Sequence, residues 1–342
     1  MTDIPLERRL SVAPMMGYTD RHGRYFLRQF TRRTLLYSEM IATGQIIYGN
    51  AAKFLKFDPA EHPIALQLGG SDPEALAQCA EVGVAAGYDE VNLNAGCPSK
   101  RVNAGAFGAC LMADPALVAR SVRAMARAVD KPVTVKCRLG IDGQESYEGL
   151  RTFVEGVFDA GAASVTVHAR VAVLGGLTPK ENREIPPLQY DWVQRLKSDL
   201  GDAEIILNGG VQSLDDVETH LRGLDGVMIG RAACANPMML ATADARIFGE
   251  PAAPVERERI ANSMLSYIDS ELASGTRLNA ITRHMFGLFQ GRPAARMWRR
   301  FLSENGAVPG AGREVVEKAL EVMGDPSAAL QDCPDISLAP AV

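Results

Sequence analysis

A cysteine at the junction of an apolar run and a glycine-rich loop is the first side chain in this sequence that could do chemistry. Cys97 lies in NLNAGCPSKRVNAG, residues 92–105. Such a thiol can be a metal ligand, half of a disulfide, a nucleophile, an acid or a small core residue. The chain has six cysteines in 342 residues, none of them in a C-x2-C pair. That pattern fits neither a zinc site nor a disulfide framework, so three alternatives stay open.

Small or polar residues close the other apolar runs as well. In chain order they are Ala13, Pro14 and Met15; Glu39; Gln67; Asn94 with Cys97; Lys136 with Arg138; His168; Asn208, Gly209 and Gly210; and Gly230 with Arg231. One polar residue that closes a strand is usually structural. A group able to bind or donate at nearly every strand end predicts a functional site.

Eight short β-rich apolar runs must position these groups. They span residues 10–15, 35–41, 64–68, 90–94, 132–137, 164–169, 204–209 and 226–230. Helix signals lie between most of them: Asp72 and Asp114 are N-cap residues before proline, and Ser213 with Asp216 resembles a capping box. Eight nearly continuous apolar runs separated by helices predict a parallel sheet closed into a (β/α)8 TIM barrel. Chemistry in such a barrel sits at the C-terminal ends of the strands.

The pattern changes after Phe248, where EPAAPVERER is linker-like and the following segment is helical without a strand signal. We therefore expect a catalytic TIM-barrel domain over residues 1–248, a small all-helical domain over 249–325 and a loosely ordered tail over 326–342.

The last two strand ends indicate the ligand. The NGG at 208–210 and the IGR at 229–231 offer backbone N–H groups and one charge where barrels of this class commonly hold a phosphate. Lys136 and His168 suit the electron-rich edge of a polar ring, and Gln67 suits a pyrimidine-like edge. These residues favour a flavin mononucleotide (FMN) site, with a phosphosugar as the alternative.

Six motifs then carry a family resemblance. SVAPMMGYTD, VNLNAGCPS, VTVKCRLG, VTVHAR, LNGGV and MIGRA, in that order, resemble the tRNA-dihydrouridine synthases, flavoenzymes that reduce uridine in tRNA. LTPKENREIPPLQYDWV and RHMFGLFQGRPAARMWRRFLSEN are similar to the bacterial A-type branch, which acts on the D-loop at positions 20 and 20a. The resemblance covers about residues 10 to 305.

The resemblance implies a cofactor, a reductant and roles for individual residues. FMN is the expected cofactor and NADPH the expected reductant, with the preference over NADH left open. Cys97 is implied to be the general acid. The implied FMN contacts are Ala13, Pro14, Met15, Gln67, Lys136, His168, Asn208, Gly209, Gly210, Gly230 and Arg231.

The reaction needs a proton donor, and this explains why a thiol would suit it. Hydride from flavin N5 adds to C6 of uracil, so a proton must reach C5. A thiol of ordinary pKa, about 8.5, is mostly protonated at neutral pH, whereas a carboxylate is not. A nucleophilic cysteine would need a lowered pKa, which Lys100 and Arg101 could provide. We favour the acid, and the role of these two cations stays open.

The net charge of −5 requires that any contact with tRNA come from local basic segments. Between Asp20 and Glu39 there are five arginines and no acid, at positions 21, 24, 28, 32 and 33; between Glu271 and Glu304 there are six, at 277, 283, 292, 296, 299 and 300. Either segment can be an ordinary solvated face. The spacing of the last four arginines predicts one helical face that tracks phosphates.

A target base must be extruded to reach a flavin, and Asn94 and Tyr18 are candidates to hold it. The residues expected to contact RNA are Asn94, Lys180, Arg183, Arg296, Arg299 and Arg300.

Two rival functions remain. One is an FMN oxidoreductase acting on a free pyrimidine, similar to dihydroorotate dehydrogenase, which would not need the basic helical segment. The other is an RNA-binding or chaperone-like protein whose barrel has lost its chemistry. No apolar run approaches a membrane span and the start MTDIPLERRL lacks a signal-peptide pattern. We therefore expect a cytoplasmic, monomeric enzyme that binds neither membrane nor metal.

Overall fold

Eight parallel strands form a closed barrel in the computed structural model, which describes residues 6–99, 102 and 105–324. Each strand pairs with its sequence neighbour, and β1 also pairs with β8, which closes the ring. The strands are β1 Leu10–Val12, β2 Leu35–Ala42, β3 Ile64–Gly69, β4 Glu90–Ala95, β5 Val133–Arg138, β6 Ser164–His168, β7 Ile205–Asn208 and β8 Gly226–Ile229. The predicted TIM barrel is confirmed, and only β1 is clearly shorter than expected.

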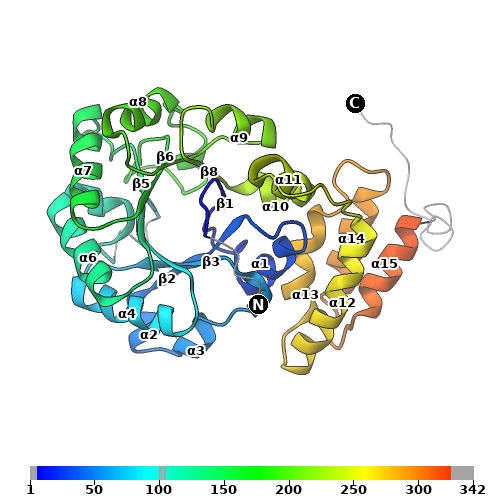
Figure 1. Cartoon of the computed structure of the whole chain (residues 1–342). Coiled ribbons are helices and arrows are strands. Elements are labelled where there is room, and N and C mark those ends of the chain that lie inside the picture. Colours follow the sequence, from blue (N-terminus) through cyan, green and yellow to red (C-terminus); the bar gives the residue numbers. More distant parts are fainter. Residues whose placement is uncertain (1–5, 100–101, 103–104, 325–342) are drawn as a thin grey trace.

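Helices surround the barrel, as Figure 1 shows. They are α1 Arg21–Arg28, α2 Thr43–Ile47, α3 Ala51–Phe54, α4 Pro73–Ala85, α6 Pro115–Ala128, α7 Tyr147–Asp159, α8 Tyr190–Leu200, α9 Leu214–His220, α10 Arg231–Ala235 and α11 Ala243–Phe248. The predicted caps are confirmed: Asp72 and Asp114 accept from first-turn N–H groups, and Ser213 and Asp216 form a reciprocal capping box. Local sequence therefore sets where these helices begin.

Four further helices pack against one side of the barrel, next to α1 and α10 (Figure 1). They are α12 Arg257–Ala273, α13 Leu278–Thr282, α14 Ala295–Asn305 and α15 Glu314–Gly324. A single apolar cluster joins barrel residues such as Phe26 to helical residues such as Met264 and Trp298. Tyr25 stacks on Tyr267 with 3.8 Å between ring centroids. The C-terminal helices thus share a core with the barrel side that carries α1.

The first basic segment is structural. The guanidinium of Arg24 is buried and its Nε donates to Glu61 at 2.6 Å. Arg28 is buried among backbone carbonyls, and burial lowers its pKa to about 10. Arg21 pairs with Glu271 of α12, and Arg33 pairs with Glu7 and Glu250. These arginines join the chain to itself, so the segment is not a phosphate-binding face, and Arg32 is its only arginine classed as exposed.

The described part of the chain has no helix that is long and apolar enough to cross a membrane. The same residues contain no group of three or more His, Cys, Asp or Glu side chains placed to hold a metal ion. The five described cysteines are free, and Cys333 lies outside the described residues.

Candidate active site

The predicted site residues converge at the C-terminal mouth of the barrel. Gln67 lies on β3, Asn94 on β4, Lys136 on β5, His168 on β6 and Asn208 on β7. Neighbouring strands bring them together in register, since Asn94 pairs with Lys136 and His168 pairs with Asn208. Ala13, Pro14 and Met15 follow β1, and Gly230 follows β8. One mouth therefore holds all of these groups.

Lys136 is the central cation of the mouth. Its Nζ donates to Oδ1 of Asn208 at 2.8 Å. Burial and, to a smaller extent, the nearby positive charge of Arg138 together lower the pKa of Lys136 to about 7. Because half of such groups are neutral near pH 7, an anionic ligand that restores the charged form would bind with a strong dependence on pH.

His168 is neutral at physiological pH. It is 8% exposed, and burial together with Arg138 and Lys136 holds its pKa well below the ordinary value. A neutral imidazole has one donor and one acceptor nitrogen, so His168 can form hydrogen bonds with a polar ring without adding charge.

The Gly209-Gly210 turn is pressed against the β6–α8 loop. Both glycines have positive φ, 110° and 76°. A Cβ on Gly209 would lie 2.6 Å from His168, and one on Gly210 would lie 2.4 Å from the hydroxyl of Tyr190. That hydroxyl donates to the carbonyl of Gly209 at 2.8 Å. The turn therefore needs glycine for its own packing, and it leaves backbone beside the mouth.

Gly230 and Arg231 follow β8, which pairs with β7, the strand that leads into that turn. A Cβ on Gly230 would meet the sulfur of Met15 at 3.7 Å, so β1 and β8 end side by side. Arg231 begins α10 and is about half exposed, and its guanidinium pairs with Glu184 at 2.9 Å. The side chain also lines the cavity described below. Its position suits a ligand phosphate or a larger substrate equally well.

Cys97 is half-buried at the end of β4, beside the cations of the mouth. Its N–H, like that of Gly96, donates to Oδ1 of Asn94, at 3.0 and 3.1 Å. Its carbonyl accepts from the N–H of Ala109 at 3.0 Å. Two backbone bonds therefore hold the residue, which stays partly exposed. Lys100 and Arg101, whose roles were left open, lie outside the described residues.

Arg138 was noted only as a strand end, and the structure gives it a clear positioning role. It is 4% exposed and donates to the carbonyls of Gly96, Val171 and Asn182 at 2.9–3.0 Å. It thereby ties the loop that carries Cys97 to the β6–α8 loop. Burial lowers its pKa to about 10.

Arg170, two residues after the end of β6, is a further candidate that is not among the predicted strand-end residues. It donates to the carbonyls of Glu184 and Pro186, and its Nε is buried without a hydrogen-bond partner in the described part of the protein. This donor, in the loop after β6, is available to an anionic ligand. The motif VTVHAR already contained this arginine, two residues after His168.

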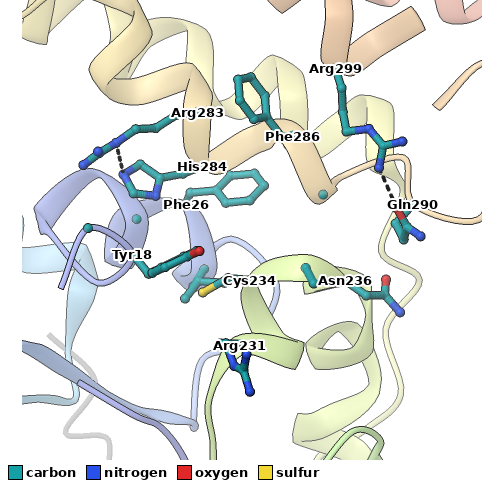
Figure 2. Close-up of a pocket in the computed structure, with 15 residues that line it drawn as sticks. Tyr18, Phe26, Arg231, Cys234, Asn236, Arg283, His284, Phe286, Gln290 and Arg299 are labelled. Atoms are coloured by element: carbon teal, nitrogen blue, oxygen red, sulfur yellow. Dashed lines mark hydrogen bonds between the residues drawn. The ribbon is translucent and has the colours of Figure 1, made fainter. Parts of the chain in front are cut away.

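A cavity of about 820 Å³ adjoins the mouth, between the β1–α1 segment, α10 and the C-terminal helices. Figure 2 shows Tyr18 and Arg231 on the barrel side of the cavity and Arg283, Phe286 and Arg299 on the side of the C-terminal helices. It does not include Cys97, Lys136 or His168, so it is an extension of the site rather than its centre. Its lining residues are Gly17, Tyr18, Gly23, Phe26, Leu27, Arg231, Cys234, Ala235, Asn236, Arg283, His284, Phe286, Gly287, Gln290 and Arg299.

The basic face of the C-terminal helices is smaller than predicted. Helix α14 begins at Ala295, so Arg292 precedes it and does not share its face. Arg296, Arg299 and Arg300 are exposed on the helix, and Arg300 pairs with Glu304 at 2.8 Å. Arg299 donates to Gln290 at 3.1 Å and lines the cavity. Arg296 and Arg299 are therefore the better candidates for phosphate contacts.

Lys180 precedes and Arg183 ends a short 3-10 turn, Glu181–Arg183, in the loop after β6, and both are exposed. Arg183 lies close enough to Tyr18 and Cys97 for their charges to influence its pKa, which burial and Arg231 lower. The loop thus places two exposed cations near the mouth, together with the acidic Glu181 and Glu184.

Comparison with known proteins shows the family of the chain. The family model described as "Dihydrouridine synthase (Dus)" matches residues 11–323. The tRNA-dihydrouridine(20/20a) synthase of Vibrio parahaemolyticus is 56% identical over 91% of this chain and 96% of its own length. The proteins of that name from Shewanella oneidensis and Escherichia coli K12 are 55% and 53% identical, covering 92% and 95% of this chain and 94% of each relative. The chain therefore belongs to the dihydrouridine synthase family.

Proposed function

We propose that this protein reduces uridine to 5,6-dihydrouridine in the D-loop of tRNA, at positions 20 and 20a. The observation that carries the proposal is the partly exposed Cys97 beside a mouth of buried cations, in a chain more than half identical to synthases named for these positions.

The residues of the mouth fit FMN. The turn at Gly209 and Gly210 presents backbone after β7, and Arg231 follows the neighbouring strand β8. The Nε of Arg170, in the loop after β6, has no hydrogen-bond partner in the described part of the protein. These groups would hold the phosphate. Lys136, neutral His168 and Gln67 would face the ring system. When bound, the reduced flavin supplies a hydride for C6 of the uracil ring, with NADPH as the source of its electrons.

The chain's own residues supply the rest of the chemistry. Cys97 delivers the proton to C5, and its backbone bonds to Asn94 and Ala109 hold it in position. Arg138 keeps the loop that carries the thiol against the β6–α8 loop. Asn94 has an amide hydrogen left over for the extruded base.

The cavity beside the mouth is the proposed route for the tRNA backbone. Arg231, Arg283 and Arg299 line it with Tyr18 and Phe286, a mixture of cations and aromatic rings that suits phosphates and unstacked bases. In this proposal residues 1–248 form the catalytic domain and 249–325 the tRNA-binding domain. A monomeric enzyme in the cytoplasm belongs to the same proposal.

The decisive experiment has two parts. The purified protein should show a bound-flavin absorption spectrum, and tRNA from a strain that lacks the gene should lose dihydrouridine at positions 20 and 20a. Turnover of free uracil or orotate without turnover of unmodified tRNA would favour the free-pyrimidine oxidoreductase. A colourless protein that binds no added FMN would favour an RNA-binding protein without chemistry.

The low pKa of Lys136 predicts that FMN affinity falls at alkaline pH. Binding to the anionic ligand requires protonated Lys136, and the free protein loses this proton above pH 7. The dissociation constant of FMN should therefore rise between pH 7 and 9, approaching about tenfold per pH unit. Fluorescence titration of the flavin-free protein measures this.

The Lys136→Met variant should bind FMN weakly and without this slope, because a phosphate has already completed its second ionisation, near a pKa of about 6. Lys197→Met is the control, since Lys197 lies on α8 and pairs with Asp225. A slope that survives in Lys136→Met would assign the pH dependence to another group.

Arg296→Ala combined with Arg299→Ala should weaken tRNA binding by about tenfold and lower the slope of log K against log salt by about 1 per lost phosphate contact. The flavin spectrum should not change, since neither residue lines the barrel mouth. Filter binding at several salt concentrations measures both quantities.

Arg120→Ala combined with Arg123→Ala provides the matched control, since both arginines are exposed three residues apart on α6. Equal salt slopes for the two double variants would exclude a specific basic track on α14.

A further inference from the structure

An unbroken chain of side-chain hydrogen bonds runs through the barrel interior from its N-terminal end to the loop of Cys97. Thr134 Oγ1 donates to Glu90 at 2.6 Å, and Asn92 Nδ2 donates to Thr134 at 2.9 Å. Gln67 Nε2 donates to Asn92 at 2.8 Å, and Asn94 Nδ2 donates to Gln67 at 2.8 Å. We call Glu90, Thr134, Asn92, Gln67 and Asn94 the polar relay.

The relay lies where barrels usually hold branched apolar side chains. Glu90 and Asn92 are 0% exposed, Gln67 is 1% and Thr134 is 2%. Glu90 and Asn94 are four residues apart on β4, so the relay covers about 13 Å along the strand. A buried polar chain is costly unless every member is satisfied, and here each member has a partner.

The hydrogen-bond direction is fixed at both ends of the relay. At the mouth, the backbone N–H groups of Gly96 and Cys97 can only donate, so the atom of Asn94 that they contact is the acceptor oxygen. At the other end, the guanidinium of Arg8 can only donate to Glu90, at 2.6 Å, and the hydroxyl of Tyr37 donates to the same carboxylate. The carboxylate thus accepts the Thr134 hydroxyl, and every amide between the ends must be oriented as observed.

We infer that Glu90, Thr134 and Asn92 are positioning residues for the reaction. Their hydrogen bonds fix whether the oxygen or the NH2 group of the Gln67 and Asn94 side chains points toward the ligands. None of the three touches the mouth. Through them Gln67 keeps its oxygen toward Asn94 and its NH2 toward Asn92, which leaves one N–H of Gln67 and one of Asn94 for the flavin and the base. The inference rests on the proposed function for the identity of these ligands.

Thr134 offers a sharp test, since two substitutions separate hydrogen bonding from packing. Thr134→Val keeps the shape and removes the hydroxyl, so Asn92 loses its acceptor and the amides of the relay lose their fixed orientation. Thr134→Ser keeps the hydroxyl and removes a methyl group. If Thr134 acts only through packing, Thr134→Val should have a small effect and Thr134→Ser a large one. If it acts through the relay, Thr134→Val should have the large effect and Thr134→Ser the small one.

The first readout needs no flavin. Amide hydrogen exchange at Gly96 and Cys97 in the flavin-free protein should be faster by about threefold or more in Thr134→Val and unchanged in Thr134→Ser. The second readout is FMN affinity, which should fall by about three- to tenfold in Thr134→Val with a shifted visible flavin spectrum, and recover in Thr134→Ser.

Thr166→Val is the matched control, because Thr166 of β6 is a 3% exposed threonine outside the relay. Asn92→Leu removes the hydrogen bonds of Asn92 to Thr134 and Gln67, and it replaces Thr134→Val as the test variant if Thr134→Val does not fold. Combined with Thr134→Val it should add no further loss of affinity, because both variants interrupt the same chain.

Unchanged exchange in Thr134→Val, equal losses in Thr134→Ser and Thr134→Val, or an equal effect of Thr166→Val would each overturn the inference. A wild-type protein that binds no FMN would count against the proposed function alone, since the exchange measurement still decides the role of the relay.

Discussion

Cys97→Ala should leave FMN bound and reduce the rate of uridine reduction by about 10²- to 10⁴-fold, the usual contribution of a positioned general acid. Alanine keeps the backbone N–H that donates to Asn94 and the carbonyl that accepts from Ala109, so the loop has no reason to move. Only the proton donor to C5 is lost. Single-turnover oxidation of the reduced flavin by unmodified tRNA measures the rate, and the visible spectrum measures cofactor binding.

Cys110→Ala is the control for this experiment. Cys110 is a neighbouring, partly buried thiol whose Sγ contacts the carbonyl of Phe107 at 3.1 Å. The Cys110→Ala variant should reduce uridine at the wild-type rate. Near-normal turnover of Cys97→Ala would rule out the general-acid role, and loss of flavin from that variant would instead indicate a structural role for the thiol.

Arg24→Met should lower the free energy of unfolding at neutral pH by about 3–5 kcal/mol, because it leaves a buried carboxylate without its partner. Glu61 is 0% exposed, and its Oε2 accepts the Nε–H of Arg24 at 2.6 Å. Burial already raises the pKa of Glu61 above 4.5, while Arg24 lowers it. Urea denaturation of wild type and variant measures the difference.

The loss should depend on pH in a defined direction. Without Arg24 the folded-state pKa of Glu61 rises further, so the folded chain binds a proton that the unfolded chain has released. The destabilisation is therefore full above that raised pKa and shrinks as the pH falls toward 4.5. Arg32→Met, an exposed arginine in the same segment, should change stability by less than about 0.5 kcal/mol. Equal losses in the two variants would contradict the buried-pair explanation.

The ion pairs of Arg21 and Arg24 could not be predicted from the sequence. The segment from Arg21 to Arg33 has no acidic residue, so it resembles a solvated or RNA-binding face. The partners that bury its charges are distant in sequence: Glu61 lies 37 residues from Arg24, and Glu271 lies 250 residues from Arg21. No local pattern encodes such pairings, because they depend on which elements pack together.

The sequence by itself determined the eight strands, most helix starts and the residues at the strand ends. These features depend on short-range physics: apolar runs, N-cap chemistry, and parallel strands that place their C-terminal ends at one mouth. The tertiary structure decided which polar groups are buried, which backbone carbonyls Arg138 and Arg170 bind, and that a cavity lies between the mouth and the C-terminal helices. Burial, charge pairing and the direction of the polar relay arise only when distant segments meet, and that is why these features were absent from the sequence patterns.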